Sequence, residues 1–167
     1  DDVERAVADP GGQPRAVGVD HRRHPVVERR VGRDVLDHVR SEHNGTNGFY
    51  MAAFAGGEGN ASISDSVFAL NGSNGIWVAA TDTSRMFAQI ERSVVANNGD
   101  DGIRISAQQD ARLGATVTRN AITRNAVNGI SVNGPGFLQA TLSENSILHH
   151  QEIGVREARL HAVQRRP

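Results

Sequence analysis

Apolar residues recur along this chain at an interval of 27 residues, which is the distance in sequence from Gly75 to Gly102. The pair Gly75-Ile76 returns as Gly102-Ile103 and again as Gly129-Ile130, and Gly154-Val155 follows after a slightly shorter step. Four further columns stay in register with these pairs: Ile63, Ile90, Val117 and Leu142; Phe68, Val95, Ile122 and Ile147; Met51, Val78, Ile105 and Val132; Ala61, Ala88, Ala115 and Ala140. A repeat of this length, about 27 residues, indicates stacked units, each of which packs mainly against its neighbours.

Within each unit the apolar residues have the spacing of strands. Ile76 and Val78 are two residues apart, so both point to one face while Trp77 points to the other. Asn, Gly, Ser and Asp, which favour turns, separate the apolar groups. The sequence therefore predicts an all-β parallel solenoid, a β-helix of about 4 to 5 coils over residues 43–155, with three short strands per coil. We expect one shared core that contains Ile76, Val78, Ile103, Ile105, Ile130 and Val132.

A column of polar residues accompanies the apolar ones. Asn44, Asn71, Asn98 and Asn125 each precede a repeat Gly by four residues, and His150 takes the fifth place. An inward Asn at a turn can bond backbone groups and the Asn of the next coil, so we expect a stacked ladder. For the repeat Gly we expect a backbone with φ > 0, which Gly adopts without strain.

Three segments carry a more specific likeness: SVFALNGSNGIWV (66–78), SVVANNGDDGIRI (93–105) and NAITRNAVNGISV (120–132). They resemble the right-handed parallel β-helix repeats of the pectate-lyase-like superfamily, and the resemblance covers about residues 43–155. It implies a right-handed solenoid, an extracellular or cell-surface location and a polysaccharide as partner. It does not imply one activity, because the superfamily includes lyases, glycoside hydrolases, esterases, epimerases and adhesins.

The two ends of the chain lack the repeat. Residues 1–40 contain eight Arg, nine Val and six Asp but no Ile, Ser, Thr or Asn, whereas every Asn lies between Asn44 and Asn145. We interpret residues 1–42 as a non-repeat leader that is disordered or translated out of frame, and residues 156–167 as a non-repeat tail. The alternative for the tail is a short amphipathic cap. Because the leader contains too few large apolar side chains to cover the first coil, we expect fragment-like behaviour and self-association through the coil ends.

One outward column is the candidate substrate-binding surface. Tyr50, Trp77, Arg104, Ser131 and Arg156 occupy the same place in successive coils. The resemblance places polysaccharide on such a face, where aromatic rings stack on sugars and an Arg binds a hydroxyl or carboxylate. The alternative interpretation is that outward aromatic side chains only shield the sheet.

Asp100, Asp101 and Arg104 are the candidate catalytic residues. Paired carboxylates could act as acid and base or bind calcium beside an Arg, and the segment GDDGIRI is similar to the Asp-Asp segment of polygalacturonases. The match is incomplete: Asn47 stands where a carboxylate would be needed, no Gly-His-Gly follows, and the chain has no Lys. The alternative is that the two Asp residues are turn formers in place of Ser73 and Asn74.

Composition narrows the remaining choices. The formal net charge is −1, there is no Cys, and no apolar run is long enough to span a membrane. We therefore expect no nucleic-acid partner, no membrane insertion, no thiolate chemistry, and neither cofactor nor metal apart from the calcium alternative. Two functions remain: a non-catalytic structural or carbohydrate-binding domain of a secreted or surface protein, which the incomplete catalytic set favours, and a fragment of a polysaccharide lyase or hydrolase.

Overall fold

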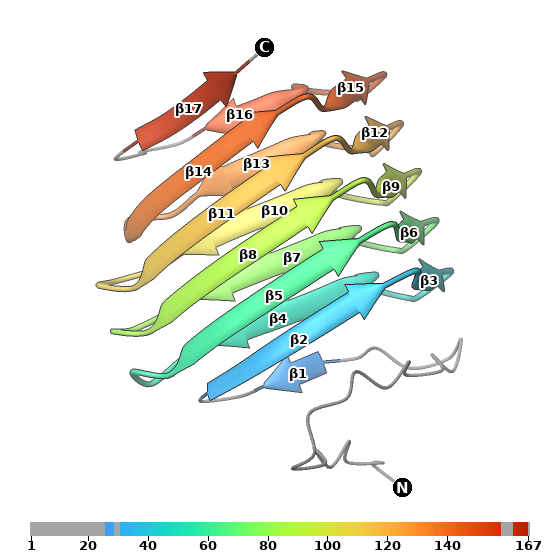
Figure 1. Cartoon of the computed structure of the whole chain (residues 1–167). Coiled ribbons are helices and arrows are strands. Elements are labelled where there is room, and N and C mark those ends of the chain that lie inside the picture. The colour runs from blue at the N-terminus through green and yellow to red at the C-terminus, as the bar shows by residue number, and fades with distance from the viewer. Residues whose placement is uncertain (1–25, 29–30, 158–161, 167) are drawn as a thin grey trace, which may run out of the picture.

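The described part of the chain is built from strands alone. A computed structural model describes residues 26–28, 31–157 and 162–166; these ranges contain 17 strands and no helix. The strands form three parallel sheets, called here sheets A, B and C (Figure 1). Sheet A contains β1 (Val26–Glu28), β4 (Phe49–Ala53), β7 (Ile76–Ala80), β10 (Ile103–Ala107), β13 (Ile130–Asn133) and β16 (Val155–Glu157).

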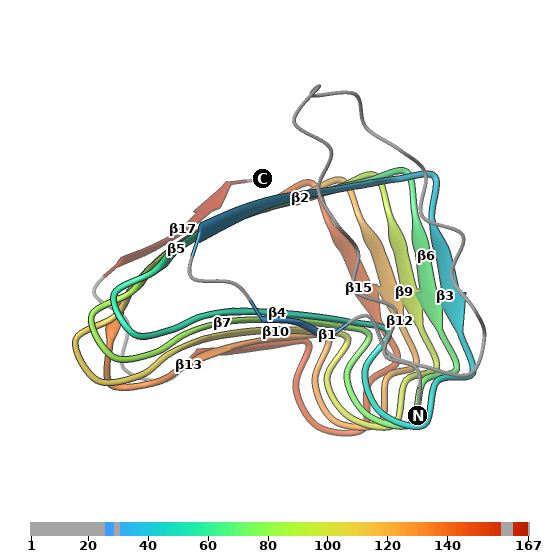
Figure 2. The same ribbon diagram turned by 90° about the horizontal axis from the view of Figure 1, so that it is seen from below.

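The other two sheets follow the same order of coils. Sheet B contains β2 (Val31–Asp37), β5 (Glu58–Ser64), β8 (Arg85–Glu91), β11 (Arg112–Thr118), β14 (Phe137–Ser143) and β17 (Ala162–Arg166). Sheet C contains the short strands β3 (Arg40–Glu42), β6 (Val67–Ala69), β9 (Val94–Ala96), β12 (Ala121–Thr123) and β15 (Ser146–Leu148). Seen along the solenoid, sheets A and B form the two long sides and sheet C closes one end (Figure 2).

The register confirms the predicted parallel β-helix. Ile103 pairs with Ile76 on one side and with Ile130 on the other. All six residues predicted to share the core have no exposed surface, and Trp77 lies on the outer face, partly exposed. The inward side chains from successive coils form one continuous core: Phe49, Met51, Ile63, Phe68, Ile90, Val95, Leu113, Val117, Ile122 and Leu138 are also part of it.

The Asn ladder is present as predicted. The backbone N–H and the side-chain amide of Asn71 both donate to Oδ1 of Asn98, over 3.1 and 2.9 Å, and the same kind of bonds join Asn44 to Asn71 and Asn98 to Asn125. His150 ends the ladder, because its Nδ1 accepts from the N–H of Asn125 at 3.3 Å. That bond leaves the ring proton on Nε2, which lies 3.3 Å from the carbonyl of Ile122.

The prediction of positive φ for the repeat Gly residues is wrong. Gly75 and its counterparts do not have positive φ. A Cβ on Gly75 would lie 2.7 Å from Gly102 O and 2.4 Å from a methyl of Val95, so the absence of a side chain lets successive coils stack closely. One column of residues with positive φ directly precedes the ladder positions, with φ of 54 to 59°: His43, Leu70, Asn97, Arg124 and His149.

Parallel pairing extends beyond the predicted limits 43 and 155. β2 pairs with β5 over seven positions and β3 pairs with β6 over three, so residues 31–42 belong to an additional coil. β17, in the predicted tail, pairs with β14. Leu36 is the register partner of Ile63 and packs against the core, so one apolar column also extends into the additional coil. Residues 1–25 lie outside the described part of the chain, and the reading frame of residues 1–42 stays a prediction.

Candidate functional site on sheet A

The outward column of sheet A is a continuous row of contacts. Tyr50, Trp77, Arg104 and Ser131 are successive register partners on β4, β7, β10 and β13. The ring centroids of Tyr50 and Trp77 are 4.6 Å apart with a tilt of 45°, and the Arg104 guanidinium carbon lies 5.3 Å from the Trp77 ring. The structure therefore brings the aromatic pair and the Arg together, as the sequence predicts.

Polar neighbours fix this row. The indole N–H of Trp77 donates to Oγ of Ser106, two residues beyond Arg104, over 3.0 Å. Ser131 is only 2% exposed, and its Oγ accepts from the side-chain amide of Asn133 at 2.9 Å. Trp77 is thus held in one orientation, whereas Ser131 is less accessible than the sequence suggests. Neither Ser106 nor Asn133 was predicted as part of the site, because in a strand pattern they are ordinary outward polar residues.

A hollow of about 320 Å³ adjoins the row at Arg104. It is lined by Asp100, Asp101, Arg104, Val127, Asn128, Ser131 and Asn133. The three candidate catalytic residues and the candidate Ser131 therefore lie in one place. Asn128 could have been found from the sequence, since it occupies the position of Asp101 in the next repeat.

Asp100 and Arg104 give the hollow its charge. Asp100 Oδ2 lies 4.0 Å from Nη1 of Arg104. Burial raises the pKa of Asp100 above its ordinary value and the charge of Asp101 adds to this rise, whereas Arg104 opposes it. Arg104 Nε is buried and has no hydrogen-bond partner. The hollow thus contains a carboxyl group that is easier to protonate than usual and a guanidinium group whose side chain is 35% exposed.

Asp101 belongs to a second polar column, which consists of Asn47, Asn74, Asp101 and Asn128. In this column the donors point back toward the preceding coil. Asn74 donates through its backbone and side-chain N–H groups to Asn47 Oδ1, and Asn128 donates in the same way to Asp101 Oδ1, over 3.2 and 2.6 Å. The structure places Asp101 in the turn position of Asn74, in agreement with the turn interpretation.

The second column is interrupted at Asp101. Oδ1 of Asn74 is buried without a hydrogen-bond partner, and an ionised carboxylate at position 101 has no proton to offer it. A buried polar atom without a partner costs about 1 to 3 kcal/mol. An acidic side chain that is 3% exposed, in a column otherwise made of amides, therefore lowers stability at the hollow. Such a departure from local rules is typical of functional positions.

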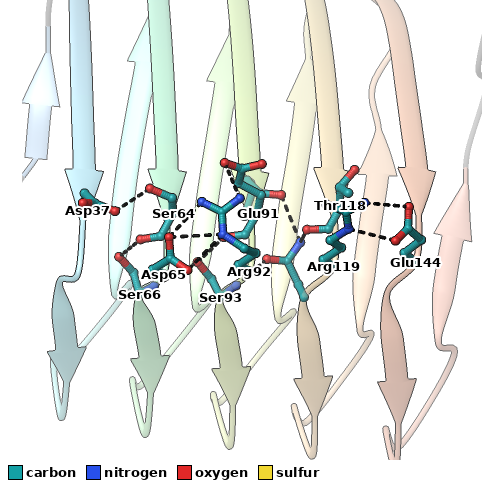
Figure 3. A network of polar contacts seen from close by, with 12 residues as sticks. Asp37, Ser64, Asp65, Ser66, Glu91, Arg92, Ser93, Thr118, Arg119 and Glu144 are labelled. Atoms are coloured by element: carbon teal, nitrogen blue, oxygen red, sulfur yellow. Dashed lines mark hydrogen bonds and ion pairs between the residues drawn. The ribbon is translucent and has the colours of Figure 1, made fainter.

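A separate set of charged groups follows the turn between sheets B and C (Figure 3). Arg92 binds both carboxylate oxygens of Asp65, in the preceding coil, at 2.8 to 3.2 Å, and Arg119 binds Glu144 of the following coil at 2.8 Å. This exposed charge ladder connects coils and shares no residue with the hollow. Its Arg side chains form ion pairs with Asp65 and Glu144.

Metal and membrane signals are absent from the described residues. Within residues 26–28, 31–157 and 162–166, no group of three or more His, Asp or Glu side chains could hold a metal ion, and no helix could cross a membrane.

Taken together, the three parallel sheets, the repeating coil and the polar ladders define a parallel β-helix protein. A family model described as the right-handed beta helix region matches residues 35–159, so the chain belongs to the right-handed β-helix family. This membership is consistent with the likeness to the pectate-lyase-like superfamily and names no activity. No curated protein and no solved structure gives a significant match.

Proposed function

We propose that this chain is a non-catalytic carbohydrate-binding β-helix domain of an extracellular or cell-surface protein, with acidic polysaccharide as its ligand. The binding surface is the outer face of sheet A. The observation that carries the proposal is the continuous row of Tyr50, Trp77 and Arg104 beside a polar hollow. Rings supply a stacking surface for a sugar, and the partly exposed guanidinium group of Arg104 supplies donors for its carboxylate.

The non-catalytic role is supported by the way Asp101 is used. Its carboxylate accepts two hydrogen bonds from Asn128 and is almost completely buried, so it is tied to the turn. That leaves Asp100 as the only carboxylate lining the hollow that is partly exposed, whereas acid and base catalysis of glycoside hydrolysis needs two carboxylates flanking the bond.

Replacement of Trp77 by Ala tests the proposal. The variant loses the ring between Tyr50 and Arg104, so its dissociation constant for polygalacturonate should rise roughly tenfold, with an unchanged circular dichroism spectrum. Affinity gel electrophoresis measures this. Phe137→Ala is the matched control, because it removes an exposed aromatic ring from sheet B. Equal retardation of Trp77→Ala and the parent chain would exclude sheet A as the binding surface.

One observation favours a second candidate function, a polysaccharide lyase or hydrolase. The raised pKa of Asp100 is a property of a general acid. Assays for new reducing ends and for unsaturated products over a panel of uronate polymers decide between the two. Product that disappears in Asp100→Asn would establish the enzyme, and binding without product would leave the non-catalytic domain.

A further inference from the structure

Sheet B carries a second hollow, on the opposite side of the solenoid from the candidate site. Sheets A and B are the two long sides of the cross-section, so their outer side chains point in opposite directions (Figure 2). The second hollow has a volume of about 300 Å³ and is lined by Arg33, Asn60, Ala61, Ser62, Phe87 and Gln89. None of these residues belongs to the site on sheet A.

Phe87 is the aromatic surface of this hollow. It is 48% exposed, which is unusual for a ring in the middle of a strand. Its register partner on β11 is Gly114, and a Cβ there would lie 3.2 Å from Cδ2 and 3.7 Å from Cε2 of Phe87. The ring therefore leans over β11 at the one position of that strand without a side chain. This leaning opens the hollow on the β5 side of the ring.

Apart from Ala61, the rest of the lining is polar, and it contains one charged residue. Asn60 is the register partner of Phe87 on β5, and Ser62 is the partner of Gln89. Two amides and a hydroxyl offer both donors and acceptors, which suits the hydroxyl groups of a ligand. Arg33 is the only charged residue of the lining, whereas the hollow on sheet A contains two Asp and one Arg.

We propose that this hollow binds a neutral saccharide, which stacks on Phe87 and bonds to Asn60, Ser62 and Gln89. A purely apolar ligand would leave the amides without partners, and a polyanion would find a single cation. The inference goes beyond the proposed function of sheet A, since it assigns a second ligand class to other residues. With sites on opposite faces, one solenoid holds an acidic and a neutral polysaccharide chain at the same time.

Affinity gel electrophoresis of the full chain in neutral polymers (glucomannan, xylan, mixed-linkage glucan) and in polygalacturonate tests this inference. Phe87→Ala should weaken binding to a neutral polymer roughly three- to tenfold and leave polygalacturonate binding unchanged. Phe137→Ala is the matched control, because Phe137 is on the same sheet, is equally exposed and lies outside the hollow. Gly114→Ala, which places a methyl group against the Phe87 ring, should weaken binding to the same neutral polymer.

The outcomes separate the two sites. Loss of neutral-polymer binding in Phe87→Ala, with retention in Trp77→Ala, supports the sheet B site whatever happens with polygalacturonate. The inference is overturned if no neutral polymer retards the parent chain, if Phe87→Ala and the parent are retarded equally, or if Trp77→Ala alone loses the neutral polymer. Because both Phe variants remove exposed rings, circular dichroism should show an unchanged fold.

Discussion

Two polar columns, three residues apart in every coil, place buried polar side chains at turns. The hydrogen bonds are continuous in the first column and interrupted in the second. In the first, Asn44, Asn71, Asn98 and Asn125 form an unbroken chain of hydrogen bonds directed toward the next coil. In the second, the bonds point toward the preceding coil and stop between Asn74 and Asp101. Asn74 and Asp101 are as buried as the first column, so the difference does not come from exposure to water.

The comparison distinguishes a column that stabilises the fold from a position, Asp101, that changes the chemistry of the hollow. An amide carries a donor and an acceptor, so a stacked Asn satisfies its neighbours on both sides, whereas a carboxylate can only accept. The Asp at position 101 therefore leaves one hydrogen bond unmade at a turn that lines the sheet A hollow. Burial raises the pKa of Asp100, and the charge of Asp101 adds to this rise, which an Asn could not do.

The largest expected effect comes from the unbroken column. Asn98→Ala removes the acceptor of two Asn71 donors and the amide that bonds to Asn125 and to the carbonyl of Phe68. Several buried groups then lack partners, so the free energy of unfolding should fall by about 3 kcal/mol in urea denaturation. The exposed Asn60→Ala should change it by less than about 0.5 kcal/mol. Equal losses in the two variants would contradict a structural role for the ladder.

The second column should respond in the opposite direction. Asp101→Asn provides an amide that can donate to Oδ1 of Asn74 while its own Oδ1 still accepts from Asn128. The free energy of unfolding should rise by about 1 kcal/mol, again measured in urea. If the hollow binds ligand, the same variant should bind polygalacturonate differently from the parent chain. A destabilised Asp101→Asn would show that the missing hydrogen bond is not a cost to the fold.

The sequence predicts the register of the coils and the orientation of side chains within each strand, but it does not predict the hydrogen bonds at the turns. A constant repeat length fixes the register, and alternation fixes which side chains point inward, as for Ile103 and Trp77. The order of hydrogen bonds within a ladder depends on how turns stack, which spacing does not reveal. For the same reason, the sequence does not show whether a Gly is needed for positive φ or for close packing. Gly75 is needed for close packing of the coils.

The site was predicted only where columns carry unusual residues. Tyr50 and Trp77, the single Tyr and Trp of the chain, drew attention to sheet A, and Asp100 and Asp101 marked its turn. Asn133 and Ser106 were missed because outward Ser and Asn are common in every coil. The hollow on sheet B was missed because it results from the leaning of Phe87 over Gly114, which is a property of two neighbouring strands.

The smallest expected effect belongs to the exposed charge ladder, whose pairs also connect consecutive coils (Figure 3). The hydrogen bonds from Arg92 lower the pKa of Asp65 below its ordinary 3.8, and those from Arg119 lower the pKa of Glu144 below its ordinary 4.5. A carboxyl pKa that is lower in the folded state stabilises the fold above the ordinary value, and this stabilisation is lost as the pH falls through the lowered value. Exposed pairs contribute little, because water and salt screen them.

pH therefore distinguishes the exposed ladder from the buried one. Arg92→Gln should be slightly less stable than the parent at pH 7, and this difference should shrink as the pH falls below the ordinary 3.8 of an Asp and through the lowered pKa of Asp65. The deficit of Asn98→Ala should persist at low pH, because amides do not titrate. Urea denaturation of the parent and both variants at pH 7 and at pH 3 measures the two differences. If the Arg92→Gln deficit were the same at both pH values, it would come from packing of the Arg92 side chain against Glu91 and Asp65 rather than from charge.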